Sequence, residues 1–136
     1  MSEKAKLAQA LHAQGYNCAQ AVFCAFAEDL GVDMQTARRL MEGFGGGMGD
    51  RSNVCGAVSG AVAAVGYYFS NGVPERGPQR NMGYGKVGEM TKAFDALYGG
   101  NICANILQAN PCGQKVYDAA AIVDLTSGRR LKFVDQ

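Results

Sequence analysis

The sequence predicts an all-α fold: a compact single-domain bundle of about five to seven helices with glycine-rich connecting loops, over residues 1–136. Apolar residues recur at helical spacing, and no stretch shows the apolar/polar alternation with β-branched enrichment that is typical of strands. Glycines and polar residues divide the chain into segments of helical length. With 48% hydrophobic and 18% charged residues, the 136 residues fit one globular domain.

Capping residues and terminal glycines mark the first three helices, which we expect at about residues 2–13, 17–30 and 34–42. Ser2 is the predicted N-cap of the first helix, and Asn17 with Gln20 has the spacing of a capping box for the second. Gly15 and Gly31 follow the ends of these two helices, as glycines often do.

A glycine-rich segment follows at residues 43–50 and has the most unusual composition in the chain. Its glycines allow positive φ and a close approach to a neighbouring group. The segment is either a loop wrapped around a site or a flexible linker, and composition does not separate the two. In the first case, Gly46, Gly47 and the nearby Gly56 are candidate cofactor-binding residues.

Further helices are expected at about residues 52–69, at 83–98, after Asn101 and from about 111 to 126, with a polar loop at 71–81. In the first of these, Gly56, Gly60 and Ala64 repeat every four residues and form a stripe on which another helix can pack closely. The stripe packs either within the chain or across a homodimer, and the sequence leaves both open.

The bulk properties exclude some functions. The net charge is +1 and the basic residues are scattered, so we expect no nucleic-acid partner. The uncharged stretch at residues 54–69 is shorter than the ~20 residues that cross a bilayer, so we expect a buried helix rather than a membrane span. The N-terminus leads straight into amphipathic sequence without an apolar leader, which favours a cytoplasmic location.

The chain has five cysteines, which in a reducing compartment favour catalytic, redox or metal-binding roles. Four of them follow an asparagine that resembles an N-cap, in Asn17-Cys18, Asn53-Val54-Cys55, Asn101-Ile102-Cys103 and Asn110-Pro111-Cys112. Pro111 would occupy the first helical position, where proline is favoured. Each of the four thiols is therefore expected in the first turn of a helix.

A helix N-terminus stabilises a thiolate, so the pKa of these cysteines is expected to fall below the ordinary value of about 8.5. Thiolates are both the nucleophilic form of cysteine and ligands for soft metals. Cys24 lies roughly 240° around its helix from Cys18 and is expected to be a buried small hydrophobe. His12 is interpreted as a surface or partly buried side chain rather than a ligand.

The order Cys18, then Cys55-Gly56-Ala57-Val58-Ser59-Gly60, then Cys103 and Cys112 resembles the family named for the pattern C…CGAxxG…C…C (the C_GCAxxG_C_C family). The surroundings of Cys18 and the glycine-rich segment look similar too, so the resemblance covers nearly the whole chain. It implies an α-helical, redox-active domain whose four defining cysteines are these four, with Cys24 outside the set. Some members are joined to c-type cytochrome segments, but this chain has no Cys-x-x-Cys-His.

The sequence is compatible with three functions. It does not decide between them, nor whether the protein is an oxidoreductase or an electron carrier. In the first, the four cysteines converge to hold an iron–sulfur cluster, or less readily zinc or copper, and exchange electrons with a partner protein. In the second, they perform metal-free thiol–disulfide chemistry or redox sensing, with Cys103 and Cys112 the closest pair in sequence. In the third, aromatic residues line a non-redox ligand pocket, with candidates Tyr67, Tyr68, Phe69 and Tyr84.

Overall fold

The computed structural model describes residues 2–107 and 111–128, and in this part of the chain the fold is all-helical, as predicted. The elements are α1 (Glu3–Ala13), α2 (Cys18–Leu30), α3 (Met34–Met41), the 3₁₀ helix η1 (Glu42–Phe44), α4 (Gly45–Met48), α5 (Gly56–Phe69), α6 (Pro78–Tyr98), α7 (Cys103–Ile106) and α8 (Cys112–Ser127). The extended pairing in these residues is one antiparallel bridge, between Val54 and Ile102.

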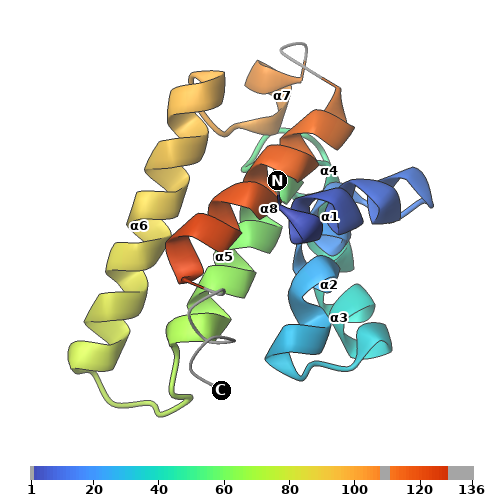
Figure 1. Cartoon of the computed structure of the whole chain (residues 1–136). Coiled ribbons are helices and arrows are strands. Elements are labelled where there is room, and N and C mark those ends of the chain that lie inside the picture. Colours follow the sequence, from blue (N-terminus) through green and yellow to red (C-terminus); the bar gives the residue numbers. More distant parts are fainter. Residues whose placement is uncertain (1, 108–110, 129–136) are drawn as a thin grey trace.

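Helix α5 forms the centre of the bundle. It packs against α2, α6 and α8, while α8 also lies against α1, as Figure 1 shows. The residues of α5 are uncharged, and Ala57, Ala61, Ala64 and Val65 are completely buried. Burial of this apolar surface against the neighbouring helices is the main driving force for the bundle. No described helix combines the length and the apolar composition needed to cross a membrane.

The boundaries of the first three helices are confirmed. The Ser2 side chain accepts a hydrogen bond from the Ala5 N–H at 3.0 Å. Asn17 and Gln20 make both hydrogen bonds of the predicted capping box, and Gly31 ends α2 in the left-handed conformation with φ 72°. These ends are set by contacts within a few residues, which is why the sequence predicts them well.

Two later helix starts were predicted wrongly. Helix α5 begins at Gly56 rather than at residue 52 or 53, because the residues before it pair with the segment that precedes α7. The Cys55 N–H donates to the Asn101 carbonyl at 2.6 Å, and the Cys103 N–H donates to the Asn53 carbonyl at 2.8 Å. Helix α6 begins at Pro78 rather than near residue 83, with the proline in its first turn.

The glycine stripe of α5 packs within the chain, against α2. A Cβ at Gly60 would lie 2.5 Å from the Ala19 carbonyl oxygen, and one at Gly56 would lie 3.1 Å from the Ala19 nitrogen. Both neighbours are backbone atoms that cannot move independently of α2. The close approach of α2 to α5 therefore requires glycine at these positions, and it fixes Cys18, at the start of α2, next to the start of α5.

We expect the Gly60→Ala substitution to lower the free energy of unfolding by about 1–3 kcal/mol, because the new methyl group overlaps the Ala19 carbonyl. Gly66→Ala, in the same helix, is the matched control. A Cβ there meets nothing within 4 Å, so alanine should stabilise the protein by up to about 1 kcal/mol through its better helix propensity. Urea denaturation of both variants measures this difference, and equal effects would contradict the packing described.

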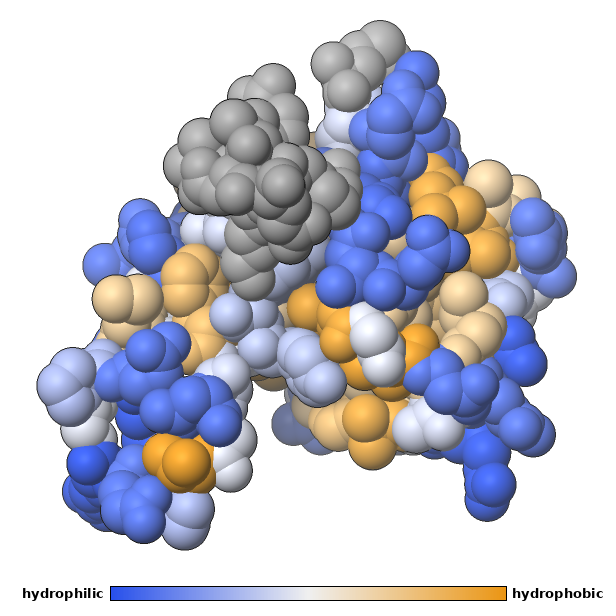
Figure 2. Space-filling model, turned by 60° about the horizontal axis from the view of Figure 1, so that its bottom comes forward, coloured by the Kyte–Doolittle hydropathy of each residue, from blue (hydrophilic) through white to orange (hydrophobic). Residues whose placement is uncertain are grey.

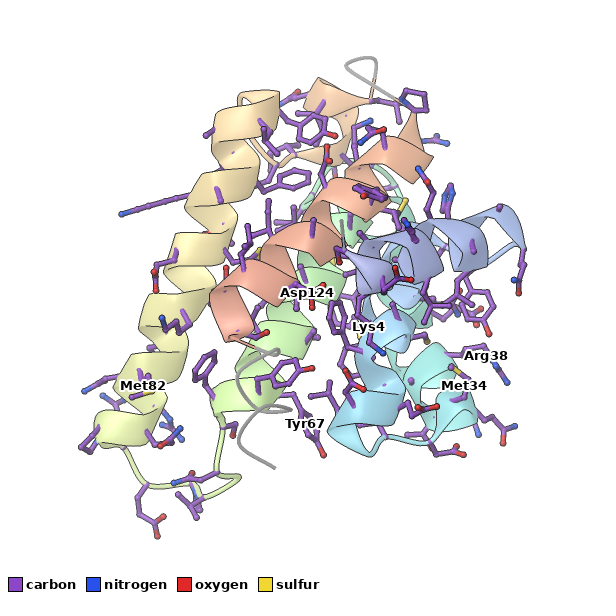
Figure 3. The ribbon with its side chains drawn as sticks, in the orientation of Figure 1. Lys4, Met34, Arg38, Tyr67, Met82 and Asp124 are labelled. Carbon is purple, nitrogen blue, oxygen red and sulfur yellow. The ribbon has the colours of Figure 1, made fainter. Side chains whose placement is uncertain are left out.

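Helix α1 is fixed to its neighbours near its N-terminus. Lys4 forms an ion pair with Asp29 of α2 at 3.5 Å, and the Ser2 hydroxyl hydrogen-bonds with Asp124 of α8. Figure 3 shows Lys4 and Asp124 near each other where α1 crosses α8. Further along α1, the Gln9 side-chain amide donates to the Gly113 carbonyl at 3.3 Å. These contacts place the last turn of α1 beside the first turn of α8.

Candidate functional site

The fold gathers the N-terminal ends of α2, α5, α7 and α8, and with them the four cysteines of the sequence pattern. Cys18, Cys103 and Cys112 are the first residues of α2, α7 and α8, and Cys55 is the N-cap of α5. The thiol of Cys18 interacts electrostatically with the other three thiols, and Cys55 also interacts with Cys103. We refer to these four residues as the cysteine cluster.

The asparagine N-caps are correct only for α2. Cys55 and Ile102 cap α5 and α7 in place of Asn53 and Asn101, because both asparagines belong to the paired extended segments. Pro111 is the N-cap of α8 rather than its first residue, and Asn110 lies outside the described residues. The cysteines nevertheless lie at helix N-termini, as the sequence indicated.

The glycine-rich segment is built against the cluster and is not a simple linker. Gly46 and Gly47 adopt positive φ of 63° and 62°, and Gly47 is buried. A Cβ on Gly47 would lie 2.5 Å from the Cys103 Cβ and 3.2 Å from its sulfur. The Arg51 N–H donates to the Gly46 carbonyl at 2.8 Å, which closes the loop. Any side chain at Gly47 would therefore displace Cys103.

Cys18 and Cys112 form the accessible part of the cluster. Negative charge on Cys112 and an interaction with its side chain both raise the pKa of Cys18, which places the two thiols near each other. Both residues are partly exposed, whereas Cys55 and Cys103 retain only 4% and 9% of their accessible surface. All of these cysteines are free thiols in this structure. A reagent from solution would therefore meet Cys18 and Cys112 first.

His12 belongs to this site, although the sequence interpretation set it apart from the cysteines. Its Nε2 lies 3.8 Å from the Cys18 sulfur, and it is partly buried. The tight turn between α1 and α2 brings the last turn of α1 beside the first turn of α2. Gly15 and the Asn17 capping box already marked this turn in the sequence, so the proximity of His12 to Cys18 could have been inferred.

The expectation of lowered thiol pKa values is wrong for two of the cysteines. Burial, together with negative charge on Cys112, Cys55 and Cys103, raises the pKa of Cys18 from 9.0 to about 12. Burial also raises the pKa of Cys55, against hydrogen bonds from the backbone of Ala57 and Val58 that lower it. Desolvation and like charges here outweigh the helix N-terminus, and neither effect is visible in the sequence.

Lys115 is a second residue that the sequence did not single out. It lies in the first turns of α8 and is only 2% exposed. Its Nζ lies 3.5 Å from the Leu107 carbonyl oxygen and 5.9 Å from the centre of the Tyr98 ring. Its positive charge acts to lower the pKa of Cys55. A buried cation beside the thiols offsets negative charge that forms in the cluster.

Cys24 is a buried residue of the hydrophobic core, 1% exposed, as predicted. Burial raises the pKa of its thiol, so Cys24 stays protonated at neutral pH. It packs among the apolar residues of α2 and takes no part in the electrostatic contacts of the cysteine cluster. This makes Cys24 a suitable control position for experiments on the other cysteines.

An all-helical bundle with four cysteines at converging helix N-termini defines the class of this protein. The chain belongs to the family described as "Putative redox-active protein (C_GCAxxG_C_C)", which it matches over residues 16–125. That range contains all four cysteines of the cluster. The family label writes the hexapeptide as GCAxxG, whereas this chain has Cys-Gly-Ala-Val-Ser-Gly at residues 55–60.

An uncharacterised protein of Archaeoglobus fulgidus is 28% identical to this chain over 97 residues, which is 66% of this chain and 64% of the relative. The chain thus spans a little under two thirds of the length of that curated relative. No solved structure matches the chain.

Proposed function

We propose that the protein is a metal-free thiol–disulfide redox protein in which Cys18 and Cys112 form a reversible disulfide. The observation that carries this proposal is the position of His12 Nε2, 3.8 Å from the sulfur of the partly exposed Cys18. The partly exposed Cys112 is near enough to raise the pKa of Cys18. A thiol pair with an adjacent base is the arrangement that such chemistry uses. The pair differs from Cys103 and Cys112, which are closest in sequence.

In the reduced protein, the high pKa of Cys18 keeps its proton in place, and its S–H group can donate to a Cys112 thiolate. The Cys112 thiolate attacks one sulfur of a partner's disulfide. A mixed disulfide forms on Cys112, and the other sulfur of the partner leaves as a thiolate. We assign the first attack to Cys112 because the raised pKa of Cys18 keeps that thiol protonated.

In the second step, the Cys18 proton moves to His12 Nε2, and the resulting thiolate attacks the Cys112 sulfur. The Cys18–Cys112 disulfide forms, and the partner's remaining sulfur leaves as a thiolate that recovers the proton from His12. Two electrons have then passed from the thiol pair to the partner's disulfide. We place this reaction in the cytosol, where the pair would be kept reduced between turnovers.

The Cys18→Ser variant tests the order of these steps. After reduction and exposure to glutathione disulfide, it is expected to accumulate glutathione on Cys112, because the residue that resolves the mixed disulfide is missing. The wild type and the Cys24→Ser control should instead release glutathione and lose two free thiols. Intact-protein mass spectrometry distinguishes these products. A Cys18→Ser variant that resolves its mixed disulfide as the wild type does would refute the assigned roles.

An iron–sulfur cluster is the second candidate, favoured by the gathering of all four thiols at one place. The thiol donors fit such a group, and Cys18, Cys55, Cys103 and Cys112 would hold it, supplying one-electron transfer. The backbones of Gly47 and Gly56 lie against Cys103 and Cys18 and would line the bound group, whereas a Cβ on Gly46, the third candidate, would meet nothing within 4 Å. Within residues 2–107 and 111–128, no three His, Cys, Asp or Glu side chains are arranged to hold a single metal ion.

The Cys55→Ser variant separates the two candidates. Under the thiol–disulfide proposal, anaerobically purified protein lacks stoichiometric iron and sulfide, and Cys55→Ser still forms the Cys18–Cys112 disulfide. Under the second candidate, the wild type contains iron and sulfide in a fixed ratio, and Cys55→Ser loses both.

A further inference from the structure

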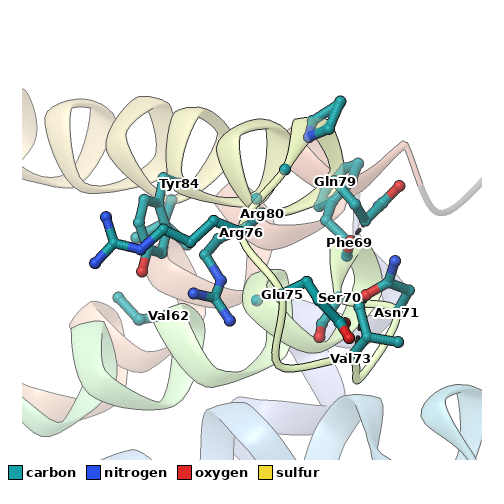
Figure 4. Close-up of a pocket in the computed structure, with 15 residues that line it drawn as sticks. Val62, Phe69, Ser70, Asn71, Val73, Glu75, Arg76, Gln79, Arg80 and Tyr84 are labelled. Atoms are coloured by element: carbon teal, nitrogen blue, oxygen red, sulfur yellow. Dashed lines mark hydrogen bonds between the residues drawn. The ribbon is translucent and has the colours of Figure 1, made fainter.

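A cavity lies at the opposite end of α5 from the cysteine cluster. It has a volume of about 520 Å³ and is enclosed by the second half of α5, the loop at residues 70–77 and the first turns of α6. Pockets that bind small molecules commonly measure about 300–1,000 Å³. Figure 4 shows residues that line the cavity, and Figure 2 shows hydrophobic residues exposed among polar ones on the face turned forward from the bottom of Figure 1.

The cavity is not filled by protein atoms because two helical positions on its walls, Gly66 and Gly83, carry no side chain. A Cβ at Gly66 of α5 would meet nothing within 4 Å, and one at Gly83 of α6 would meet only the Phe69 Cβ, at 3.7 Å. This differs from Gly60, where the neighbouring helix fills the space. Between the two glycines, Val62, Phe69 and Val87 supply an apolar lining.

Two arginines give the entrance a positive charge. Arg76 lies on the loop and Arg80 in the first turn of α6, and both extend over the space between α5 and α6 in Figure 4. Arg80 donates to the Pro74 carbonyl at 3.0 Å, which fixes its position. Arg76 makes no hydrogen bond or ion pair with another described residue. The lining contains one acidic residue, Glu75, against two arginines, so its charge is net positive.

The rim leaves apolar surface in contact with water. Tyr84 is 70% exposed and Val73 is 47% exposed, although both line the cavity. A ligand with an apolar body would cover this surface and gain the free energy of removing it from water. A negatively charged group on the same ligand would meet Arg76 and Arg80, whose guanidinium groups bind carboxylates well.

We propose that this cavity binds a small organic carboxylate with an apolar body, the carboxylate at Arg76 and Arg80 and the body between α5 and α6. The site is separate from the cysteine cluster and does not depend on its chemistry. Phe69 and Tyr84, which the sequence analysis named as candidate pocket residues, form part of its wall, whereas Tyr67 and Tyr68 do not.

The test uses 4-phenylbutyrate as the probe and 4-phenylbutanol as its uncharged counterpart, titrated into the reduced full chain and followed by amide NMR shifts. The carboxylate should saturate shifts at residues 62–87 and bind at least about tenfold more tightly than the alcohol, since charge-assisted hydrogen bonds are the stronger kind. The double substitution Arg76→Ala with Arg80→Ala should weaken binding about tenfold or more. Arg39→Ala, an exposed arginine of α3, is the control and should leave it unchanged.

Gly66→Leu is a second variant, which fills the cavity from a position with open space and should abolish binding in a folded protein. The proposal would be overturned by the absence of saturable shifts at residues 62–87, by equal affinity for the acid and the alcohol, or by unchanged binding in Gly66→Leu. Shifts that depend on protein concentration without the probe would also overturn it, because a second copy of the chain would then cover this surface.

Discussion

Replacing His12 with alanine is expected to slow closure of the Cys18–Cys112 disulfide about 100-fold at pH 7, the usual contribution of a positioned base. Burial raises the pKa of the Cys18 thiol, so Cys18 is largely protonated at this pH and its proton must be removed before it can attack. The nitrogen that can accept it is His12 Nε2, 3.8 Å away. The rate is measured by mixing reduced protein with glutathione disulfide, quenching by alkylation and quantifying the intramolecular disulfide.

Gln9→Ala is the matched control for this substitution. Gln9 also lies on α1 and contacts the first turn of α8 through the Gly113 carbonyl, but it has no group that could accept a proton from Cys18. It should therefore close the disulfide at the wild-type rate. Added imidazole should restore part of the rate in His12→Ala and have no effect on Gln9→Ala. Equal rates in His12→Ala and the wild type would remove His12 from the mechanism.

A second large effect is expected on stability at alkaline pH. The unfolded chain loses the Cys18 proton above about pH 9, whereas the folded protein keeps it until about pH 12. Between these values the unfolded state binds fewer protons, so rising pH favours unfolding. The stabilisation is complete below pH 9, and it is lost at about 1.4 kcal/mol per pH unit as the pH rises toward 12. Because Cys18 is partly exposed, solvent screens its interactions, and the loss of about 1.4 kcal/mol per pH unit is an upper limit.

The comparison of wild type with Cys18→Ser measures the contribution of Cys18 together with its interactions with the other thiols. The remaining residues that titrate in the same range are common to both proteins. The free energy of unfolding is measured by urea denaturation in reducing buffer at intervals between pH 8 and pH 11. The wild-type curve should fall more steeply above pH 9 than the Cys18→Ser curve. Parallel curves would show that the folded protein does not hold the Cys18 proton more tightly than the unfolded chain.

Features set by neighbouring residues were predicted well from the sequence. The capping box at Asn17 and the terminal Gly31 fix α2, and the i, i+4 spacing of Gly56 and Gly60 predicts the close helix contact that the structure shows. The sequence also singled out the four cysteines of the cluster as candidates, although the asparagine N-cap on which that inference rested is present only before Cys18. Whether the four cysteines lie close together depends on how α2, α5, α7 and α8 pack, and the sequence does not contain this information.

Features set by distant segments were missed. The pairing of residues 53–55 with 101–103 displaces the start of α5 and makes Cys55 an N-cap, and nothing near Cys55 in the sequence indicates that partner. The raised pKa of Cys18 depends on burial, which is a property of the assembled fold. Lys115 shows the same limitation, since a lysine in an amphipathic helix is ordinarily expected at the surface.

The most direct test of the proposed thiol pair is peptide mapping of the oxidised wild-type protein by mass spectrometry. The protein is purified anaerobically, fully reduced, oxidised with glutathione disulfide, alkylated and digested without reduction. The result we predict is a single intramolecular disulfide that joins the Cys18 peptide to the Cys112 peptide, with Cys24 alkylated. A disulfide between Cys103 and Cys112, a disulfide between two molecules, or the survival of both Cys18 and Cys112 as free thiols would contradict the proposal.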